Sequence, residues 1–397
     1  MKGMKVCSVI LSLLCGITIG IPVSAETIAP SLEQQEKALA EGQDIDQQRP
    51  RVVGYLPDWT YSAYKNVDFG ALTHLDLAFC NPDAQGNLFC YIPDEALAQI
   101  VEQAHASDVK VMAALGGFGG CEGYLPLLDT PEEMAAFNEK IMAYCEKHQL
   151  DGIDLDIELS ADHAIWNYYG DWVASLRALC DERGYALSTA TAQWVAVKVT
   201  KETFSLFDFV NVMAYDNDSD PVSHASMEFA KSSLEYFHEQ RGIAKERLVL
   251  GVPFYGRGYQ SNGSLDWNSY ESFSALIEKD PANFTGDTYQ GIAYNGADTM
   301  REKAELAKGY GGMMIWEISQ DAAGEYSLLA VIHEALSVSQ AIPGDVDGDG
   351  ICSIADAVML QHYLVGSGVL HTWKNGDLNG DGLIHAADLV LLKRLLL

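Results

Sequence analysis

From Arg51 onward, short apolar runs alternate with longer stretches in which apolar residues recur at helical spacing. The apolar runs predict eight strands near 52–57, 74–80, 109–115, 152–158, 186–192, 209–216, 247–256 and 311–319. Between them lie helical stretches such as 94–107, 131–149, 166–183, 226–241, 298–309 and 326–337. This alternation indicates an α/β fold, a (β/α)8 TIM barrel. A doubly wound open sheet is the alternative, but no glycine-rich phosphate loop follows the first strand.

The fourth predicted strand combines an apolar face with an acidic one. Residues 150–158 read Leu-Asp-Gly-Ile-Asp-Leu-Asp-Ile-Glu, and side chains on a strand alternate between its two faces. Asp154, Asp156 and Glu158 therefore share one face, opposite a face of Ile and Leu that suits a helix layer. Crowded acids repel one another, so at least one should keep its proton near neutral pH. A hydrolase needs such an acid to protonate a leaving oxygen.

The pattern changes sharply after Pro343, where two similar segments, 344–364 and 376–397, each join an Asp-rich loop to an apolar helix. Both loops have the EF-hand calcium spacing, with oxygens at positions 1, 3 and 5, Gly at 6, a backbone carbonyl at 7 and Asp at 12. The predicted ligands are Asp345, Asp347, Asp349, Ile351 and Asp356 in the first loop, and Asp377, Asn379, Asp381, Leu383 and Asp388 in the second. Pro343-Gly344 excludes an entering helix directly before the first loop, so these are not complete EF-hands.

The stretch from about Arg51 to Ser337 resembles the family-18 glycoside hydrolases, which include chitinases and endo-β-N-acetylglucosaminidases. Residues 151–158, Asp-Gly-Ile-Asp-Leu-Asp-Ile-Glu, match the D-G-x-D-x-D-x-E motif of that family without a gap. Supporting matches are Met-Ala-Tyr-Asp at 213–216, Gly-Val-Pro-Phe-Tyr-Gly-Arg at 251–257 and Gly-Gly-Met-Met-Ile-Trp-Glu at 311–317. The resemblance implies a (β/α)8 barrel with the site at the carboxyl ends of its strands.

The resemblance also implies a role for each matching residue. Glu158 is expected to be the general acid, then the base toward water, and Asp156 to orient the acetamido group of the sugar. Asp154 would share the charge and the proton of Asp156, and Tyr215 would hydrogen-bond the acetamide. The expected substrate-binding residues are Tyr55, Phe79, Met213, Asp216 and Trp316. The implied mechanism is substrate-assisted, with an oxazolinium intermediate and retention of configuration; the family is an exception to the two-carboxylate scheme.

Two sequence features qualify the expected site. The third-strand motif of the family is often Ser-x-Gly-Gly, whereas Ala114 stands in place of that serine here, which bears on the protonation of Asp154 and Asp156. The stretch between Gly256 and Gly312 is too short for the α+β insertion of many processive chitinases, so we expect a shallow, open cleft that Trp59, Trp194 and Trp267 extend. Chitin or chitooligosaccharides are the favoured substrate, with N-glycans as the alternative.

Two further interpretations of the acidic strand remain in view. Asp-x-Asp-x-Glu can bind a divalent metal, but a metal barrel would usually supply further acids or His from neighbouring strand ends, where Tyr215 and Trp316 stand instead. We therefore expect no catalytic metal. A lectin that keeps the pocket without turnover is the other alternative, although such lectins commonly lack the acid that Glu158 provides.

Residues 344–397 resemble a type I-like dockerin, whose partner is a cohesin module of a cellulosomal scaffold. The resemblance implies two structural calcium ions and a small all-α domain. The recognition positions differ between the copies, Ile354-Ala355 against Ala386-Ala387 and Gln361-His362 against Lys393-Arg394. We therefore expect one dominant docking orientation rather than two equivalent ones.

The N-terminus predicts export. Lys2 and Lys5 precede an apolar run that ends Val-Ser-Ala at 23–25, which is typical of a signal peptide cleaved after Ala25. The expected organisation is a signal peptide (1–25), a linker (26–50), the barrel (51–338), a short linker (339–343) and the dockerin (344–397). No other stretch is long and apolar enough to span a bilayer, so we expect a secreted, extracellular protein attached to a cellulosome.

The net charge limits the classes of ligand, and the cysteines raise the question of a disulfide. The net charge of −31 repels phosphate backbones and anionic membranes, so a neutral polymer or a cation fits better than a nucleic acid. Cys80 and Cys90 flank a Gly-containing loop, where a disulfide and two free thiols both remain possible. Together these observations predict a secreted glycoside hydrolase that cleaves chitin on a scaffold.

Overall fold

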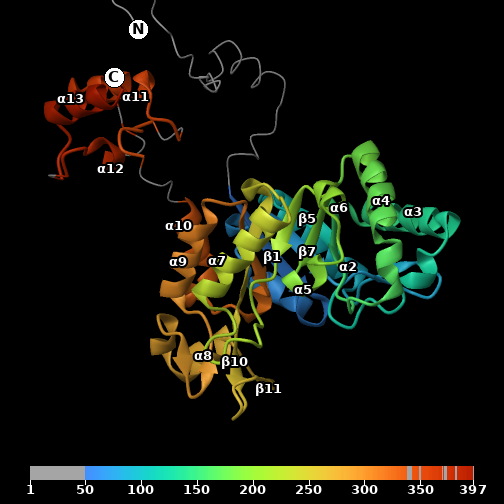
Figure 1. Cartoon of the computed structure of the whole chain (residues 1–397). Coiled ribbons are helices and arrows are strands. Elements are labelled where there is room, and N and C mark those ends of the chain that lie inside the picture. Colours follow the sequence, from blue (N-terminus) through green and yellow to red (C-terminus); the bar gives the residue numbers. More distant parts are fainter. Residues whose placement is uncertain are drawn as a thin grey trace, which may run out of the picture. The chain divides into compact units, whose positions relative to one another are not determined.

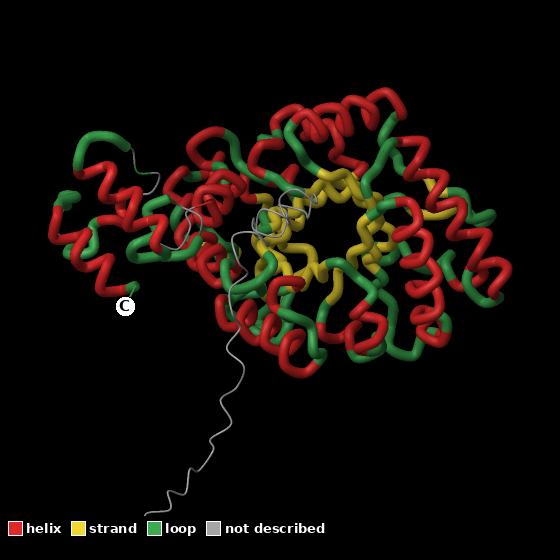
Figure 2. Tube along the Cα trace, turned by 90° about the horizontal axis from the view of Figure 1, so that it is seen from above, coloured by secondary structure: helices red, strands yellow, loops and turns green. Residues whose placement is uncertain are grey.

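Eight parallel strands close into a barrel in the order β1-β14-β9-β8-β7-β6-β5-β2, the ring seen from above in Figure 2. The computed structural model describes residues 50–337, 342–347, 350–368, 370, 373–380 and 382–396. The signal peptide and linker expected within residues 1–49 lie outside the described residues. The barrel strands are β1 Arg51–Pro57, β2 His74–Ala78, β5 Lys110–Gly116, β6 Gly152–Asp156, β7 Ala186–Thr191, β8 Phe209–Val212, β9 Leu248–Pro253 and β14 Gly312–Trp316. All eight coincide with predicted strands, which confirms the (β/α)8 expectation.

Helices form the outer layer around this ring (Figure 1). The main ones are α2 Asp94–Ala106, α3 Pro131–His148, α4 Tyr169–Arg183, α7 Met227–Glu235, α9 Ala297–Ala307 and α10 Leu328–Ser337, with the short α5 Gln193–Ala196 and α6 Lys201–Ser205 after β7. Local sequence sets their ends. Helix α3 begins after Thr130, whose side chain accepts the backbone N–H of Glu133 at 3.2 Å, and it ends at Gln149 in a left-handed conformation.

The alternation of β6 explains how the barrel holds acids at its centre. Ile153 and Leu155 face outward into the large apolar cluster between strands and helices, where both are fully buried. Asp154 and Asp156 face inward, above a second cluster that contains Tyr55, Met112 and Phe209. The apolar outer face thus fixes the register, and a shift by one residue would bury the acids against the helices.

The segment between β9 and α9 contradicts the expectation that no α+β insertion fits there. It folds into a four-stranded antiparallel sheet, β11-β10-β13-β12, together with a helix. Its elements are β10 Tyr255–Tyr259, β11 Leu265–Ser272, α8 Phe273–Lys279, β12 Thr288–Tyr289 and β13 Ile292–Ala293. The sequence pattern hid this sheet because β12 and β13 have two residues each and β11 is half-exposed along most of its length. The insertion therefore borders the cleft, to whose lining it contributes Arg257 and Trp267.

The C-terminal unit is all-α in its described part. Helices α11 Ile354–Leu364 and α13 Ala386–Leu395 pack on each other, and the short α12 Trp373–Gly376 lies between them in sequence. Val346, Ala357, Leu360 and Leu392 form its buried core. Each long helix begins with a capping box, in which the third helical residue, Asp356 or Asp388, turns back to the backbone of the cap. Among the described helices, none is long and apolar enough to cross a membrane.

The beginning of the barrel contains a small hairpin that the sequence did not predict. Strands β3 Asn81–Pro82 and β4 Leu88–Phe89 pair antiparallel directly after β2. The cysteines of the described chain, Cys80 and Cys90 included, are free thiols in this structure.

Candidate functional site

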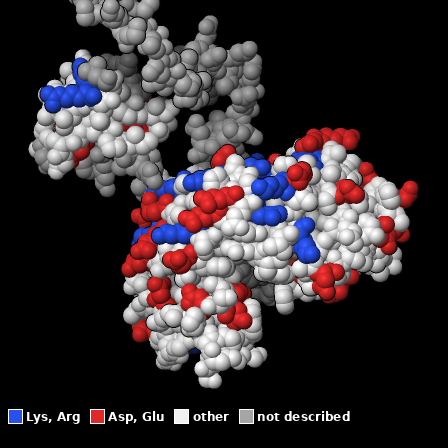
Figure 3. Space-filling model, viewed as in Figure 1, with Lys and Arg blue, Asp and Glu red and all other residues white. Residues whose placement is uncertain are grey.

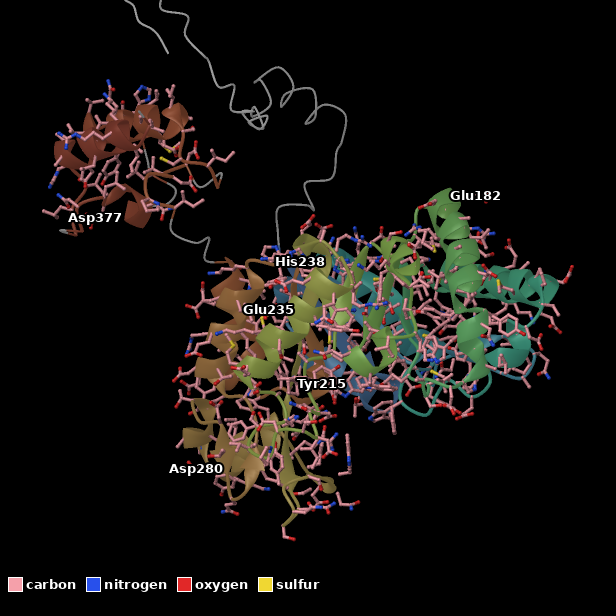
Figure 4. All side chains as sticks on the ribbon, in the orientation of Figure 1. Glu182, Tyr215, Glu235, His238, Asp280 and Asp377 are labelled. Atoms are coloured by element: carbon pink, nitrogen blue, oxygen red, sulfur yellow. The ribbon has the colours of Figure 1, made fainter. Side chains whose placement is uncertain are left out.

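A cleft of about 730 Å³ opens at the carboxyl ends of the barrel strands. In Figure 4 Tyr215 lies on the side of the barrel from which β10 and β11, labelled in Figure 1, extend. The cleft is lined by the predicted residues Phe79, Asp156, Glu158, Met213, Tyr215, Asp216 and Trp316. The other two predicted residues, Tyr55 and Asp154, are buried beneath its floor. The structure thus brings together residues from β1, β2, β6, β8 and β14.

Asp154 lies under the cleft and is held by three side chains. The Tyr55 hydroxyl donates to Oδ2 at 2.7 Å, and Ser188 Oγ donates to Oδ1 at 2.6 Å. The Asn211 amide donates to Oδ1 at 3.4 Å and to the Tyr55 hydroxyl at 3.1 Å. Burial raises the pKa of Asp154 to about 6, and these hydrogen bonds limit the increase. Among Asp154, Asp156 and Glu158, Asp154 is therefore the carboxyl group whose negative charge the surrounding donors stabilise.

Asp156 and Glu158 follow on the same face and keep their protons more strongly. Burial, followed by the charges of Glu158, Asp154 and Asp76, raises the pKa of Asp156 well above its ordinary value. Asp156 Oδ1 has no hydrogen-bond partner within the described residues, so it is free to receive one from a ligand. Burial and then the charge of Asp216 raise the pKa of Glu158 to about 7. Glu158 thus carries a proton near neutral pH at the surface of the cleft, as a general acid requires.

Asp216 differs from the other acids because the insertion supplies a cation to it. Arg257 of β10 donates from Nε to Oδ1 at 3.0 Å and from Nη2 to Oδ2 at 3.1 Å, a bidentate pair. His224 Nδ1 lies 3.2 Å from the same Oδ1. Burial alone would raise the pKa of Asp216, but its contacts with His224 and Arg257 outweigh that effect and lower it to about 2. Asp216 is therefore a permanent anion beside Glu158.

Aromatic rings form the walls of the cleft. Trp316 meets Tyr55 edge-on at 5.6 Å between ring centroids and stacks with Phe79 at 5.8 Å. Trp194 and Trp267, which we expected to extend the cleft, line it and remain 48% and 55% exposed. Trp59, the third expected extension, is exposed but is not among the lining residues. Exposed indole rings beside a carboxyl pair suit the flat apolar faces of sugars.

Three functional residues escaped the sequence reasoning. Arg257 was recognised only as the last residue of the 251–257 motif, and no role was predicted for it. In the structure it pairs with Asp216, and its guanidinium lies over the Trp267 ring at 4.9 Å from the centroid. Phe118 is 87% exposed and lines the cleft beyond β5. Asp76 of β2 is fully buried in the barrel, and burial and the charge of Asp154 raise its pKa well above the ordinary value. An acid at an inward position of a buried strand was the available signal for Asp76.

The first C-terminal loop gathers oxygen atoms as a calcium site requires. In the first loop, carboxylate oxygens of Asp345, Asp347 and Asp356 lie within 4.8 Å of one another. Backbone N–H groups of Val346 and Asp347 donate to Asp356 Oδ1 at 2.8 and 3.1 Å, which fixes that carboxylate. This oxygen-only donor set fits a hard cation such as Ca²⁺.

The second loop repeats the arrangement. Backbone N–H groups of Leu378 and Asn379 donate to Asp388 Oδ1 at 3.0 and 3.3 Å, and Gly382 N–H donates to Asp377 Oδ2 at 2.8 Å. Two of the predicted ligands, Asp349 and Asp381, lie outside the described residues. The first and last ligands of each loop correspond, because Asp345 and Asp377 each accept a glycine N–H, and Asp356 and Asp388 each accept two backbone N–H groups.

Comparison with known families decides the identity of both units. Residues 51–321 match the model of the glycosyl hydrolases family 18, and residues 343–397 match the dockerin type I domain. The chain belongs to glycoside hydrolase family 18. It carries a C-terminal type I dockerin, and the barrel described above is the family-18 domain.

Solved structures and curated relatives agree with this assignment. The family-18 chitinase ChiB of Flavobacterium johnsoniae is 34% identical, with a TM-score of 0.65, and the match covers 72% of this chain and 94% of that one. A chitinase of Bacteroides thetaiotaomicron is 25% identical, with a TM-score of 0.66 and coverage of 73% and 97%. Chitinase A1 of Niallia circulans is 22% identical, and the match covers 76% of this chain and 60% of that protein.

The family-18 domain retains its acidic motif intact but departs from the usual pattern at Ala114. Ala114 on β5 pairs with Asp154 on β6 in the sheet register. Its methyl group therefore lies where the serine hydroxyl of the usual motif would approach the acids. Ser188 of β7, also paired with Asp154, supplies a hydroxyl from the opposite side. Asp154 thus receives a hydroxyl donor from β7, while Ala114 on β5 offers none.

Proposed function

We propose that this glycoside hydrolase is a secreted chitinase, which cleaves β-1,4-linked N-acetylglucosamine chains and is held on an extracellular scaffold by its dockerin. The observation that carries the catalytic part is the row of three acids on and directly after β6, each in a different environment. Asp154 has three donors, Asp156 has an oxygen directed to no protein group among the described residues, and Glu158 has a pKa of about 7. This arrangement supports a proton donor at the cleft surface, Glu158, and beneath it an oxygen of Asp156 that can accept a hydrogen bond from the substrate.

Catalysis follows from these positions. Glu158 donates its proton to the glycosidic oxygen as the bond from C1 to that oxygen breaks, and the leaving sugar departs as an alcohol. The acetamido oxygen on C2 of the sugar that remains, whose C1 loses the glycosidic oxygen, attacks that C1 and forms the oxazolinium ring, while the acetamido N–H is held by Asp156. The Glu158 carboxylate then takes a proton from water, which attacks C1 and opens the ring. Two inversions give retention of configuration.

The other cleft residues hold the sugar for this step. Tyr215 lies in the cleft beside Asp216, where its hydroxyl is directed to the acetamido group, and Trp316 lies under the reacting ring. Asp216 keeps its negative charge at every working pH because Arg257 pairs with it. That charge helps Glu158 to retain its proton until the substrate binds.

Chitin is the proposed substrate. The supporting observations are the exposed Trp194 and Trp267 along the cleft, which suit successive sugars of a neutral polymer, and the chitinase names of the similar proteins. A side-by-side assay on chitin and on a high-mannose glycoprotein tests this choice. Release of chitooligosaccharides with little glycan release is expected, whereas the reverse would identify an N-glycan hydrolase.

Glu158→Gln separates an enzyme from a binding protein. The amide cannot donate the required proton, so turnover should fall by about 10²–10⁴-fold. Binding of chitooligosaccharides should persist, since the aromatic walls are unchanged. If the wild-type protein itself releases no oligosaccharide from either substrate, the enzymatic proposal fails and a lectin-like role replaces it.

The dockerin is proposed to bind two Ca²⁺ ions and a cohesin module. The oxygen cluster of the first loop and the matching hydrogen bonds of the second support calcium, and the exposed Ile354 and Val358 on α11 support a protein contact. Because Gln361 and His362 of the first copy correspond to Lys393 and Arg394 of the second, one docking orientation should dominate. Alanine substitution of each pair, with cohesin affinity measured, should give one large loss and one small loss; two equal small losses would contradict this.

A further inference from the structure

The small hairpin that follows β2 has a register that places two cysteines opposite each other. Strands β3 and β4 pair Asn81 with Phe89 and Pro82 with Leu88. Farther along the hairpin, the Asp83 N–H donates to the Asn87 carbonyl at 2.9 Å, which continues the same register. One step beyond Asn81 and Phe89, toward the open end, Cys80 stands opposite Cys90.

The position of this pair within the ladder suits a covalent bridge. Hydrogen-bonded and non-hydrogen-bonded pairs alternate along antiparallel strands, and the Asp83–Asn87 pair is hydrogen-bonded. Three steps on, Cys80 and Cys90 therefore form a non-hydrogen-bonded pair, in agreement with the Cys80 N–H, which donates to the Ala114 carbonyl on β5 at 2.8 Å. In such pairs the Cα atoms are about 4.5 Å apart and the side chains are close, which is within the range for disulfides.

The register brings the two cysteine side chains near each other across the ladder. Cys90 and burial raise the pKa of the Cys80 thiol well above its ordinary value, and Tyr144 is a further neighbour of Cys80. Cys80 is fully buried, whereas Cys90 is only half-buried. An oxidant in solution therefore reaches Cys90 first, with Cys80 behind it in position to complete the bond.

The residues beside Cys80 connect this hairpin to the cleft. Phe79, directly before Cys80, stacks on Trp316 in the cleft wall. Asn81, directly after it, accepts the Gly116 N–H at 2.7 Å and donates to the Gly116 carbonyl at 2.9 Å, and so fixes the end of β5. Gly117 in turn donates its N–H to the backbone carbonyl of Asp156 at 2.7 Å. The base of the hairpin therefore positions two parts of the site, Phe79 in the cleft wall and the end of β5 at Gly116 beside Asp156.

We propose that Cys80 and Cys90 form a disulfide when the chain folds in an oxidising environment, and that this bond fixes the hairpin base beside the cleft. The reaction is thiol–disulfide exchange with a small-molecule disulfide such as oxidised glutathione. The Cys90 thiolate attacks that disulfide and releases one thiol. Cys80 then attacks the mixed disulfide, so the two protein thiols are oxidised and two small thiols are produced. The proposal goes beyond hydrolysis and does not depend on the substrate.

Mass spectrometry of the wild-type protein tests the bond directly. No Lys or Arg occurs between Lys65 and Lys110, so a single tryptic peptide, residues 66–110, contains both cysteines. After equilibration of the folded protein with oxidised glutathione and alkylation without reduction, this peptide should have lost two hydrogens and carry no alkyl group. Cleavage at Asp83 should then leave two peptides joined until a reductant is added. A peptide with two alkylated thiols or two glutathione adducts would overturn the proposal.

Native-state proteolysis tests the structural role. Closing so short a loop should slow the local opening that exposes Leu88 and Phe89 to chymotrypsin by about 100-fold, and dithiothreitol should remove the protection. Cys90→Ser should be cut at the fast rate with or without reductant, while the control Cys180→Ala should behave as the wild type, because Cys180 lies in α4 and its charged neighbours are Arg177, Asp181, Arg183 and Asp208. Equal rates for oxidised and reduced wild-type protein would contradict a role in fixing the hairpin.

Discussion

Asp76→Asn should stabilise the family-18 domain, and the gain should grow with pH. Asp76 is fully buried, and neither of its carboxyl oxygens has a hydrogen-bond partner in the described part of the chain. Burial and the nearby charge of Asp154 raise its pKa well above the ordinary value, and the Tyr55 hydroxyl donates to Asp154 instead. Asparagine has nearly the same shape and no proton to lose, so the substitution isolates the cost of keeping this acid.

The magnitude follows from proton linkage. Below the unfolded pKa of about 3.9, Asp76 is protonated in both states and affects the free energy of unfolding little. Above that pH the unfolded chain releases the proton while the folded chain keeps it, so the wild type loses about 1.4 kcal/mol of stability for each pH unit. The loss stops when the pH reaches the raised folded pKa. The asparagine side chain of the variant has no such proton, so the variant should gain about 1.4 kcal/mol on the wild type between pH 5 and pH 6.

Urea denaturation of wild type and variant at several pH values measures the effect. The difference between their free energies of unfolding should increase from pH 5 to pH 6, whatever its absolute value. Asp129→Asn, at an exposed loop position, is the matched control and should follow the wild type at each pH. Parallel stability curves for Asp76→Asn and the wild type would refute the reasoning, since Asp76 would then be ionised in the folded protein.

Three further predictions concern the cleft, the dockerin and the N-terminus. Asp216→Asn removes the anion that helps to raise the pKa of Glu158 to about 7. The alkaline limb of the profile of kcat/KM against pH should therefore move to lower pH. An unchanged limb would show that Asp216 does not act on Glu158. EDTA should abolish cohesin binding but leave hydrolysis of a soluble chitooligosaccharide intact, whereas loss of turnover would restore the metal alternative. N-terminal sequencing of the exported protein should begin at Glu26, and an intact Met1 would exclude cleavage after Ala25.

The barrel was predictable because burial imposes a regular pattern on it. Ile153 and Leu155 must face the helices, so the intervening acids face inward, and the sequence alone shows this alternation. The same reasoning located Glu158 and Trp316 at strand ends, where the structure brings them into one cleft.

The insertion and its contribution to the site were not predictable in this way. The alternation along β11 is weak because most of that strand is half-exposed or exposed, so its polar residues resembled a loop. As a result the bidentate contact between Arg257 and Asp216 was missed, although it determines which acid stays ionised. Asp76 was missed for another reason, because it lies in none of the motifs that match the family, although its inward position on a buried strand was an available signal. Figure 3 shows Lys and Arg interspersed with Asp and Glu over the described part of one face, a distribution that the net charge alone could not reveal.

A crystal structure with a thiazoline inhibitor, which imitates the oxazolinium ring, tests substrate-assisted catalysis most directly. The bicyclic ligand should lie over Trp316, with its ring nitrogen at Asp156, the Tyr215 hydroxyl at its other side and Glu158 beside the anomeric carbon. A ligand bound elsewhere, or a metal ion held between Asp156 and Glu158, would contradict the proposed mechanism.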